Sequence, residues 1–280
     1  MLDVFPERDP GRKAICVNGR PHFVGVIPAH NEERTVGGVV RDILRRFPCE
    51  VVVVDDASSD GTAGEALSAG ASVLSLPARS GAWCAVQAGF RYVLSRGGGL
   101  AVTLDADGQH LPETVGLLLD EMRLGRADVV IGGCPSRFNL PKRAALALLR
   151  RLGGLTLGDV TSGLRLYNAR AMATLLTPGA VHLDYQDIGV LLLLRRAGLD
   201  VAEVKVPMRP RAHGRSRIFR TPDRMLAYVW LSALLCLCAS RRPGVSCGKR
   251  AQATPAVVSR RLELQDVALR NARVPGEAGF

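Results

Sequence analysis

The stretch Val51-Val52-Val53-Val54-Asp55-Asp56 is a continuous apolar run that ends in two carboxylates. Such a run predicts a strand buried on both faces, as in a parallel sheet. Residues 36–47 before it place apolar side chains at helical spacing, and residues 23–27 form an earlier apolar run that ends at Pro28. A strand, a helix and a strand in this order predict a βαβ unit.

The same alternation continues along the chain. Further apolar runs predict strands over 72–76, 100–104, 128–132 and 201–206. Helical spacing and capping signals predict helices after residue 62, after Pro112-Glu113, and over 85–94, 141–152 and 188–197. Strands that alternate with helices are typical of the α/β class. The sequence therefore predicts a doubly wound, mostly parallel sheet.

A second pair of carboxylates follows the run that ends at Leu104, in Asp105-Ala106-Asp107-Gly108-Gln109. In an extended backbone, Asp105 and Asp107 point to the same side, where a hard divalent cation that also binds substrate phosphates would find oxygen ligands. A simple turn, with Gly108 in a left-handed conformation, is the alternative. The matching cluster at Asp55 and Asp56 favours a ligand site, because ligands of open α/β sheets bind beyond the carboxyl ends of the strands.

The net charge of +11 is concentrated in two segments. Residues 205–224 carry a net charge of +6 and residues 240–280 a net charge of +5, so the rest of the chain is neutral. A basic patch is compatible with nucleic-acid binding, but no helix-turn-helix, zinc finger or aromatic platform accompanies it. The sequence therefore predicts no nucleic-acid partner and favours an anionic membrane surface as the partner of these basic segments.

Composition also predicts a location and a domain organisation. The seven cysteines lack metal-ligand spacing and no secretory signal is evident, so a cytoplasmic protein with reduced thiols is expected. We predict an N-terminal extension (1–22), an α/β domain (23–222), an apolar segment (223–240) and a basic, disordered tail (241–280). The uncharged run over 225–239 would form a helix of about 22 Å, too short to cross a bilayer, and is interpreted as buried, interfacial or partner-facing.

Four segments then resemble family 2 glycosyltransferases in order and spacing, and most closely the polyprenyl-phosphate branch of the dolichol-phosphate mannosyltransferase type. A fifth, Arg211 to Arg217, resembles that branch's Arg-x-x-Gly-x-Ser-Lys/Arg element. The four segments are Val26 to Glu33, Val54 to Thr62, Asp105 to Gln109 and Asp159 to Arg165. The resemblance covers about residues 24–220 and implies a GT-A (Rossmann-like) fold with a basic and apolar C-terminal appendage.

The resemblance also implies roles for individual residues. Those that would hold the sugar nucleotide are Pro28, His30, Glu32, Val54, Asp56, Asp105, Ala106 and Arg137; those that would bind Mg²⁺ or Mn²⁺ are Asp105, Asp107 and Gln109. Asp107 and Asp159 would serve catalysis, and Arg211 and Arg217 would face a phosphate. Structural alternatives stay open: Glu32 would favour a helix N-terminus, Asp159 would cap a turn or pair with Arg165, and the arginines would lie in a solvated loop.

Two segments depart from the family pattern. Where an Asn-x-Gly-x-Gly loop is usual on the phosphate side, the chain has Arg79-Ser80-Gly81-Ala82-Trp83-Cys84, with a bulky indole in place of a small residue. This departure suggests an altered choice of donor. The Gly-Ser-Arg element is displaced within residues 132–138, which makes Arg137 the candidate for its arginine.

The predicted function is a metal-dependent, inverting transfer of a sugar from a UDP- or GDP-sugar to polyprenyl or dolichyl phosphate. The enzyme is expected to lie peripherally at the cytoplasmic face of the membrane, with a small integral-membrane protein as a further candidate partner. One alternative is a saccharide hydroxyl as acceptor with Asp159 as base, because a hydroxyl must lose a proton whereas a phosphate is already anionic. Another is a nucleotide-sugar-binding scaffold without turnover.

Overall fold

The computed structural model describes residues 16–17, 20–21, 23–138, 140–181, 183, 186–209 and 229–237. Of the predicted N-terminal extension, it describes only strands β1 (Cys16–Val17) and β2 (Arg20–Pro21), which pair antiparallel. Arg211 and Arg217 lie outside the described residues, as does the tail predicted over 241–280.

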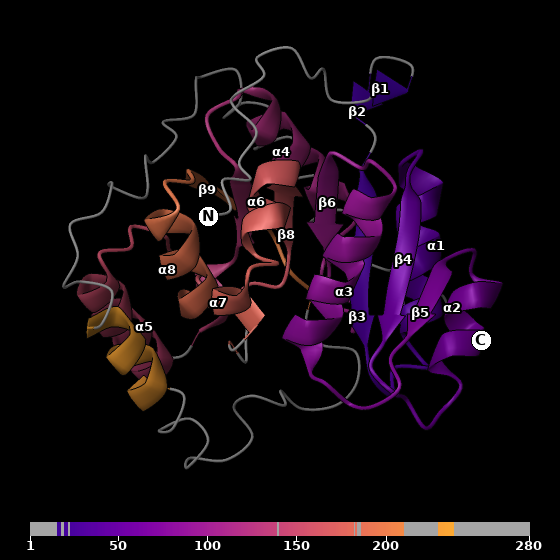
Figure 1. Cartoon of the computed structure of the whole chain (residues 1–280), viewed down its shortest axis with the longest axis horizontal. Helices are drawn as coiled ribbons and strands as arrows, with labels where there is room; N and C mark the ends of the chain where they lie inside the picture. The colour runs from indigo at the N-terminus through magenta and orange to yellow at the C-terminus, as the bar shows by residue number, and fades with distance from the viewer. Residues whose placement is uncertain are drawn as a thin grey trace, which may run out of the picture. The chain divides into compact units, whose positions relative to one another are not determined.

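The central element is a seven-stranded sheet in the order β5-β4-β3-β6-β8-β7-β9 (Figure 1). Strand β3 pairs in parallel with both β4 and β6, β4 pairs with β5, and β7 pairs with β9. The predicted α/β, mostly parallel sheet is therefore confirmed. The strands are β3 (Val24–Ala29), β4 (Glu50–Asp55), β5 (Ser72–Ser75), β6 (Leu100–Thr103), β7 (Val129–Gly133), β8 (Arg165–Asn168) and β9 (Val201–Lys205).

The helices expected from the sequence are all present. Two short helices, α6 and α7, were not predicted, and neither was the 3₁₀ turn η1. The bounds are α1 (Val36–Arg46), α2 (Thr62–Ser68), α3 (Ala82–Ser95), α4 (Glu113–Arg123), η1 (Pro135–Arg137), α5 (Leu140–Gly153), α6 (Ala169–Thr174), α7 (Pro178–Val181) and α8 (Ile188–Arg196).

Alternate residues of β4 face two separate hydrophobic cores. Val52 and Val54 pack in the core that contains side chains of α3, α5 and α8, whereas Val51 and Val53 pack in the core that contains those of α1 and α4. Successive side chains of a strand point to opposite faces of the sheet, so helices on both faces require apolar residues at every position. This packing explains the uninterrupted run of four valines.

Strand β8 departs from the predicted pattern. It runs antiparallel to both of its neighbours, β6 and β7, and is inserted between them. The sequence did not predict it because it has only four residues, begins with an arginine and leads directly into α6. Its insertion places the segment Asp159 to Arg165 beside the carboxyl end of β6.

The apolar run over 225–239 is described only at residues 229–237, which form a helix. One face of this helix packs against the core of α5 and α8, and the other face is exposed. Among the described residues, no helix has the length and apolar character needed to cross a membrane.

Candidate active site

The predicted site residues of the first three motifs lie at the ends of neighbouring strands or just after them. Ala29 at the end of β3 lies in register with Asp55 at the end of β4, and the amide of Leu104 after β6 bonds the carbonyl of Val26 in β3 (3.1 Å). The parallel strands β3, β4 and β6 therefore bring Pro28, the Asp55-Asp56 pair and the Asp105 segment to one edge of the sheet, the edge at which open α/β sheets bind ligands.

The loops after β3 and β4 are joined by reciprocal hydrogen bonds. The Ser59 amide donates to Asn31 Oδ1 (2.9 Å) and the Asn31 amide donates to Ser58 Oγ (2.9 Å). The Glu32 amide donates to Thr62 Oγ1 (2.8 Å), so the candidate residue Glu32 is fixed through its backbone to the second motif. The first two motifs consequently form one rigid unit.

Asp60 and Glu33 complete this junction. The Glu33 amide donates to Asp60 Oδ2 (3.3 Å), and the Gly61 amide donates to Glu33 Oε2 (3.0 Å). Burial alone would raise the pKa of Asp60, but hydrogen bonds from the side chain and backbone of Thr62 hold that pKa below its ordinary value. The charged form of Asp60 is therefore the form that this junction stabilises.

Asp56 is buried at the base of the site. Its Oδ1 accepts a bond from the Ser80 amide (2.6 Å) and its Oδ2 one from the Gly81 amide (2.9 Å). His30 Nδ1 lies 2.8 Å from the Asp56 carbonyl oxygen. Asp56 thus holds the loop before α3 against the two-motif junction, and its predicted contact with the nucleotide stays a prediction.

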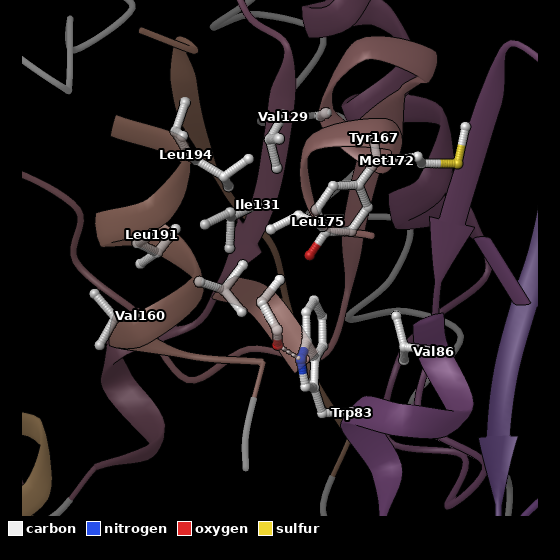
Figure 2. Close-up of a cluster of buried hydrophobic side chains, with 14 of the residues drawn as sticks. Trp83, Val86, Val129, Ile131, Val160, Tyr167, Met172, Leu175, Leu191 and Leu194 are labelled. Carbon is white, nitrogen blue, oxygen red and sulfur yellow. Dashed lines mark hydrogen bonds between the residues drawn. The ribbon is translucent and has the colours of Figure 1, made fainter. Parts of the chain in front are cut away.

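The indole of Trp83 does not occupy this loop. The side chain is buried among the residues of the α3, α7 and α8 side of the sheet (Figure 2), with its N–H donating to the carbonyl of Ala180 (2.8 Å). Its ring packs edge-on against Phe90. The expectation that this departure alters the choice of donor stays a prediction, although the indole itself lies in the core. Trp83 is a core residue. Of the two bulky residues in the departing segment, Arg79 is the exposed one.

The two carboxylates of the third motif have different environments. The Asp107 residue is buried and its Oδ1 accepts a bond from the Gln109 amide (3.1 Å), whereas the Asp105 side chain is 45% exposed. Asp105 Oδ2 lies 3.2 Å from Nε2 of the buried His110, and a Cβ at Gly163 would lie 2.3 Å from Asp105 Oδ1. The roles of His110 and Gly163 were not predicted, because they depend on contacts outside the Asp105-Asp107 spacing.

These side chains offer carboxylate and amide oxygens, the ligand chemistry of Mg²⁺ and Mn²⁺. Among the described residues, no group of three or more His, Cys, Asp or Glu side chains is arranged to enclose a metal ion by itself. Two carboxylates with one amide fit a cation that takes its other ligands from substrate phosphates and water.

The third motif is also joined to the start of the basic segment. The Arg209 amide donates to the Gln109 carbonyl (2.9 Å), Gln109 Nε2 lies 3.4 Å from the Arg209 carbonyl oxygen, and His110 forms an antiparallel bridge with Met208. In the sequence, Arg211 follows Arg209 by two residues. The candidate metal ligand Gln109 is thus next to the chain that leads into the predicted phosphate-binding residues.

Asp159 is fully buried and holds two loops together. Its Oδ2 accepts a bond from the Cys134 amide (3.2 Å), and its Oδ1 accepts bonds from the amide and hydroxyl of Thr161 (3.0 Å each). The bonds to Thr161 match the alternative in which Asp159 caps a turn. Cys134 precedes η1, which contains the backbone of Arg137; the side chain of Arg137 lies outside the described residues.

Glu203 in β9 supports the Asp159 loop and was not predicted from the sequence. Its carboxylate accepts bonds from the amides of both Gly158 and Asp159, the second at 2.8 Å. A Cβ at Gly133 would lie 2.1 Å from Glu203 Oε1, so the glycine makes room for this carboxylate. A lone acidic residue within the apolar strand Val201–Lys205 was the available signal.

Comparison with known proteins identifies the family. Residues 26–176 match the model of Glycosyl transferase family 2. The chain is 31% identical over 212 residues to the undecaprenyl-phosphate mannosyltransferase of Micrococcus luteus, covering 69% of this chain and 86% of the relative. It is 30% identical over 183 residues to the polyprenol monophosphomannose synthase of Mycolicibacterium smegmatis, covering 59% and 69%.

Among solved structures, glucosyl-3-phosphoglycerate synthase of Mycobacterium tuberculosis in complex with Mn²⁺ and UDP-glucose is similar, with a TM-score of 0.59, 25% identity and 81% coverage of each chain. The mixed sheet with carboxylates at adjoining strand ends, together with these similarities, defines a glycosyltransferase of the GT-A fold. The chain belongs to glycosyl transferase family 2.

Proposed function

We propose that this glycosyltransferase transfers a sugar from a UDP- or GDP-sugar to polyprenyl or dolichyl phosphate, with inversion at the anomeric carbon. The observation that carries the proposal is the pairing of Gln109 with Arg209, which brings the start of the basic segment to the Asp105-Asp107 motif. The printed names of the relatives in Micrococcus luteus and Mycolicibacterium smegmatis, which specify undecaprenyl phosphate and polyprenol, agree with a lipid phosphate acceptor.

In the proposed reaction, an oxygen of the acceptor phosphate attacks the anomeric carbon as the bond from that carbon to the nucleotide diphosphate breaks. A Mg²⁺ or Mn²⁺ ion held by Asp105, Asp107 and Gln109 would neutralise the charge that develops on the leaving diphosphate. Support for this ion comes from the oxygen donors at the strand end and from the Mn²⁺ in the similar solved structure. The junction of the first two motifs would receive the base and ribose, with Pro28, His30, Glu32, Val54 and Asp56 nearest to them.

The acceptor phosphate is already anionic, so it needs orientation and charge neutralisation rather than proton removal. Arg211 and Arg217 would supply this through the planar fork of the guanidinium group, which pairs with two phosphate oxygens. Their position in the basic segment, two and eight residues after Arg209, supports this role.

The burial of Asp159 disfavours the alternative with a saccharide hydroxyl as acceptor. A general base must approach the proton that it removes, but the described conformation buries Asp159 completely and bonds its carboxylate to Cys134 and Thr161. We propose that Asp159 positions the loop before η1, and with it Arg137.

We further propose a location at the cytoplasmic face of the membrane, where a lipid-linked acceptor would present its phosphate. The basic segment supports this location, because each Lys or Arg near an anionic bilayer favours binding. We also propose a small integral-membrane protein as a partner that would hold the enzyme at this face.

The decisive experiment incubates the full chain with UDP- and GDP-sugars, Mg²⁺ or Mn²⁺ and a polyprenyl phosphate, and measures lipid-linked sugar. R211A and R217A should each lower kcat/KM for the lipid phosphate by at least about tenfold, since each removes charge-assisted hydrogen bonds. R215A, in the same segment but outside the phosphate-facing pair, is the matched control and should leave the rate within about twofold. Equal activity of all three variants would overturn the assignment of a phosphate acceptor, and metal-dependent donor binding without product would favour a scaffold.

A further inference from the structure

His110 is a buried residue whose ring contacts a candidate metal ligand. Only 2% of its side chain is exposed, and its Nε2 lies 3.2 Å from Oδ2 of Asp105. A carboxylate that binds a metal is ionised and can only accept hydrogen bonds, so the ring nitrogen is the donor. The contact therefore joins a buried imidazole to a carboxylate that is 45% exposed.

The second ring nitrogen of His110 has no comparable contact. Within the described part of the chain, Nδ1 is buried and forms no hydrogen bond. A buried polar atom without a partner costs free energy, which an apolar side chain of similar size would avoid. Stability therefore does not explain a histidine at this position, whereas its contact with Asp105 does.

The turn between the two residues brings them together. Gly108 has a φ of 74°, in the left-handed region that glycine adopts without strain, and Oδ1 of Asp107 accepts a bond from the Gln109 amide (3.1 Å). The chain reverses its direction in this turn. The ring of His110 is thereby brought against the Asp105 carboxylate, five residues earlier in the sequence.

Contacts with other segments limit the movement of both partners. His110 forms an antiparallel bridge with Met208, so its backbone is held by the chain that leads into the basic segment. On the other side, a Cβ at Gly163 would lie only 2.3 Å from Oδ1 of Asp105. The Asp105 carboxylate consequently lies between a fixed hydrogen-bond donor and a fixed stretch of backbone.

We propose that His110 is a positioning residue, which orients the Asp105 carboxylate for a divalent cation without binding the cation itself. Its Nε2 is directed at Asp105 and its Nδ1 is buried. Hydrogen bonds from a second residue hold a ligating carboxylate in its orientation, and their removal lowers metal affinity by about 10- to 100-fold. This inference rests on the proposed function, in which Asp105 is a metal ligand.

The test measures Mn²⁺ binding to the full chain in the presence of UDP or GDP, by electron paramagnetic resonance of the free ion and without acceptor. H110L removes the donor and keeps a side chain of similar size, so it should weaken Mn²⁺ binding by at least about tenfold. H110Q places an amide N–H near the position of Nε2 and should keep the affinity within about threefold of the wild type.

Denaturant unfolding distinguishes a positioning role from a structural one. H110L loses the unpartnered Nδ1, and water can replace the lost bond at the half-exposed Asp105, so its unfolding midpoint should equal or exceed that of the wild type. A lower midpoint together with unchanged Mn²⁺ affinity would make His110 a structural residue and overturn the proposal. H110M provides a second apolar replacement if circular dichroism shows that H110L is unfolded.

Q87L is the matched control, because Gln87 is a buried polar residue outside the candidate site. Its Nε2 donates to the carbonyl of Leu175 (2.8 Å), which Q87L would leave without this partner. Q87L should therefore lower the unfolding midpoint and leave Mn²⁺ affinity within about twofold. An equal loss of affinity in H110L and H110Q would contradict the positioning role, since it would indicate that the ring itself binds the ion.

The Mn²⁺ measurement separates this inference from the proposed acceptor. If the wild type formed no lipid-linked sugar but bound Mn²⁺ in a manner dependent on His110, the proposed acceptor would be refuted and the positioning role supported. A wild type that bound no Mn²⁺ with either nucleotide would refute both the metal site and the role of His110.

Discussion

The Asp105 carboxylate lies directly against the backbone of Gly163, such that a Cβ on Gly163 would come within 2.3 Å of Oδ1 and 2.6 Å of Oδ2. The two residues belong to motifs 58 positions apart, which the antiparallel pairing of β6 with β8 brings together. Thr103, two residues before Asp105, donates its hydroxyl hydrogen to the Gly163 carbonyl (2.7 Å) and fixes this approach. The orientation of the exposed carboxylate thus depends on the absence of a side chain at position 163.

G163A should therefore displace Asp105 without unfolding the protein. We expect kcat/KM for sugar transfer to fall by about a hundredfold, because small misplacements of a group that binds the reacting centre are costly. Titration of Mn²⁺ in the presence of the nucleotide should show a weaker apparent affinity, which supplies a readout independent of turnover.

The matched control is G116A in α4, where an added Cβ meets nothing within 4 Å. Replacing a helix-interior glycine by alanine at an open position should raise the free energy of unfolding by about 0.5–1 kcal/mol and leave the rate unchanged. Similar kinetics for G163A and the wild type would contradict the proposed dependence of Asp105 on Gly163.

Trp83 affords a test of whether the departure from the family pattern affects the donor. Because the indole lies in the core and bonds the Ala180 carbonyl, W83F should destabilise the fold by about 1–3 kcal/mol through the lost hydrogen bond and packing. The ratio of kcat/KM between UDP- and GDP-sugars should remain that of the wild type. Denaturant unfolding measures the first effect and competition between donors the second.

R79A is the informative comparison for W83F, since Arg79 is exposed and precedes Ser80, whose amide bonds Asp56. If W83F changed the ratio of kcat/KM between UDP- and GDP-sugars and R79A did not, Trp83 would contribute to donor choice. That result would contradict its assignment to the core.

Glu203 should contribute to stability through the Asp159 loop. E203Q replaces a charged acceptor of two backbone N–H groups by a neutral amide with one acceptor oxygen, so we expect a loss of about 1–3 kcal/mol in the free energy of unfolding. Amide hydrogen exchange at Gly158 and Asp159 should accelerate, which locates the effect.

E113Q is a suitable control for E203Q. Glu113 is exposed and lies 3.5 Å from Arg46, a surface pair that contributes little to stability. Its substitution should change the free energy of unfolding by less than about 0.5 kcal/mol. If E203Q also changed the free energy of unfolding by less than about 0.5 kcal/mol, water would be satisfying the Gly158 and Asp159 amides in place of the Glu203 carboxylate.

The architecture could be predicted from the sequence because it depends on local patterns. The runs at 51–54 and 100–104 carry the signature of strands covered on both faces, and the helical spacing between them gives the order of the elements. Strand β8 could not be predicted in this way, since its pairing is set by contacts with distant strands. Arg165 illustrates the difficulty: it is fully buried, with its guanidinium bonding the carbonyls of Val160 and Ser162.

For the candidate site too, some residues could be predicted from the sequence and others could not. Spacing alone predicted Asp105 and Asp107 at a strand end, and resemblance added the motif of Asp159. The supporting residues His110, Gly163 and Glu203 could not be found, because the bridge of His110 to Met208 and the contacts of Gly163 and Glu203 join segments that are far apart in the chain. The burial of Trp83 could not be predicted for the same reason, since a sequence gives the position of a side chain but not the direction in which a helix turns it.

Cys49 provides a pH-dependent prediction. Burial raises the pKa of its thiol to about 12, which leaves about one thiolate in ten thousand at pH 8. In the unfolded chain the thiol titrates near pH 9, so the folded state binds this proton more tightly and gains stability from it below pH 9. That contribution should be lost as the pH rises from about 9 to about 12, and Cys49 in the native protein should resist alkylation at pH 8.

Mass spectrometry after iodoacetamide treatment at pH 8 measures the first outcome: Cys49 should be modified at least about a hundredfold more slowly in the native protein than in denaturant. The second outcome is measured by comparing the free energy of unfolding of the wild type and C49A between pH 8 and pH 10. Because alanine carries no titrating proton, the difference between the two proteins should shift in favour of C49A as the pH rises. A difference that is constant over this range, or rapid native alkylation, would mean that the thiol is accessible to solvent and titrates at its ordinary pKa.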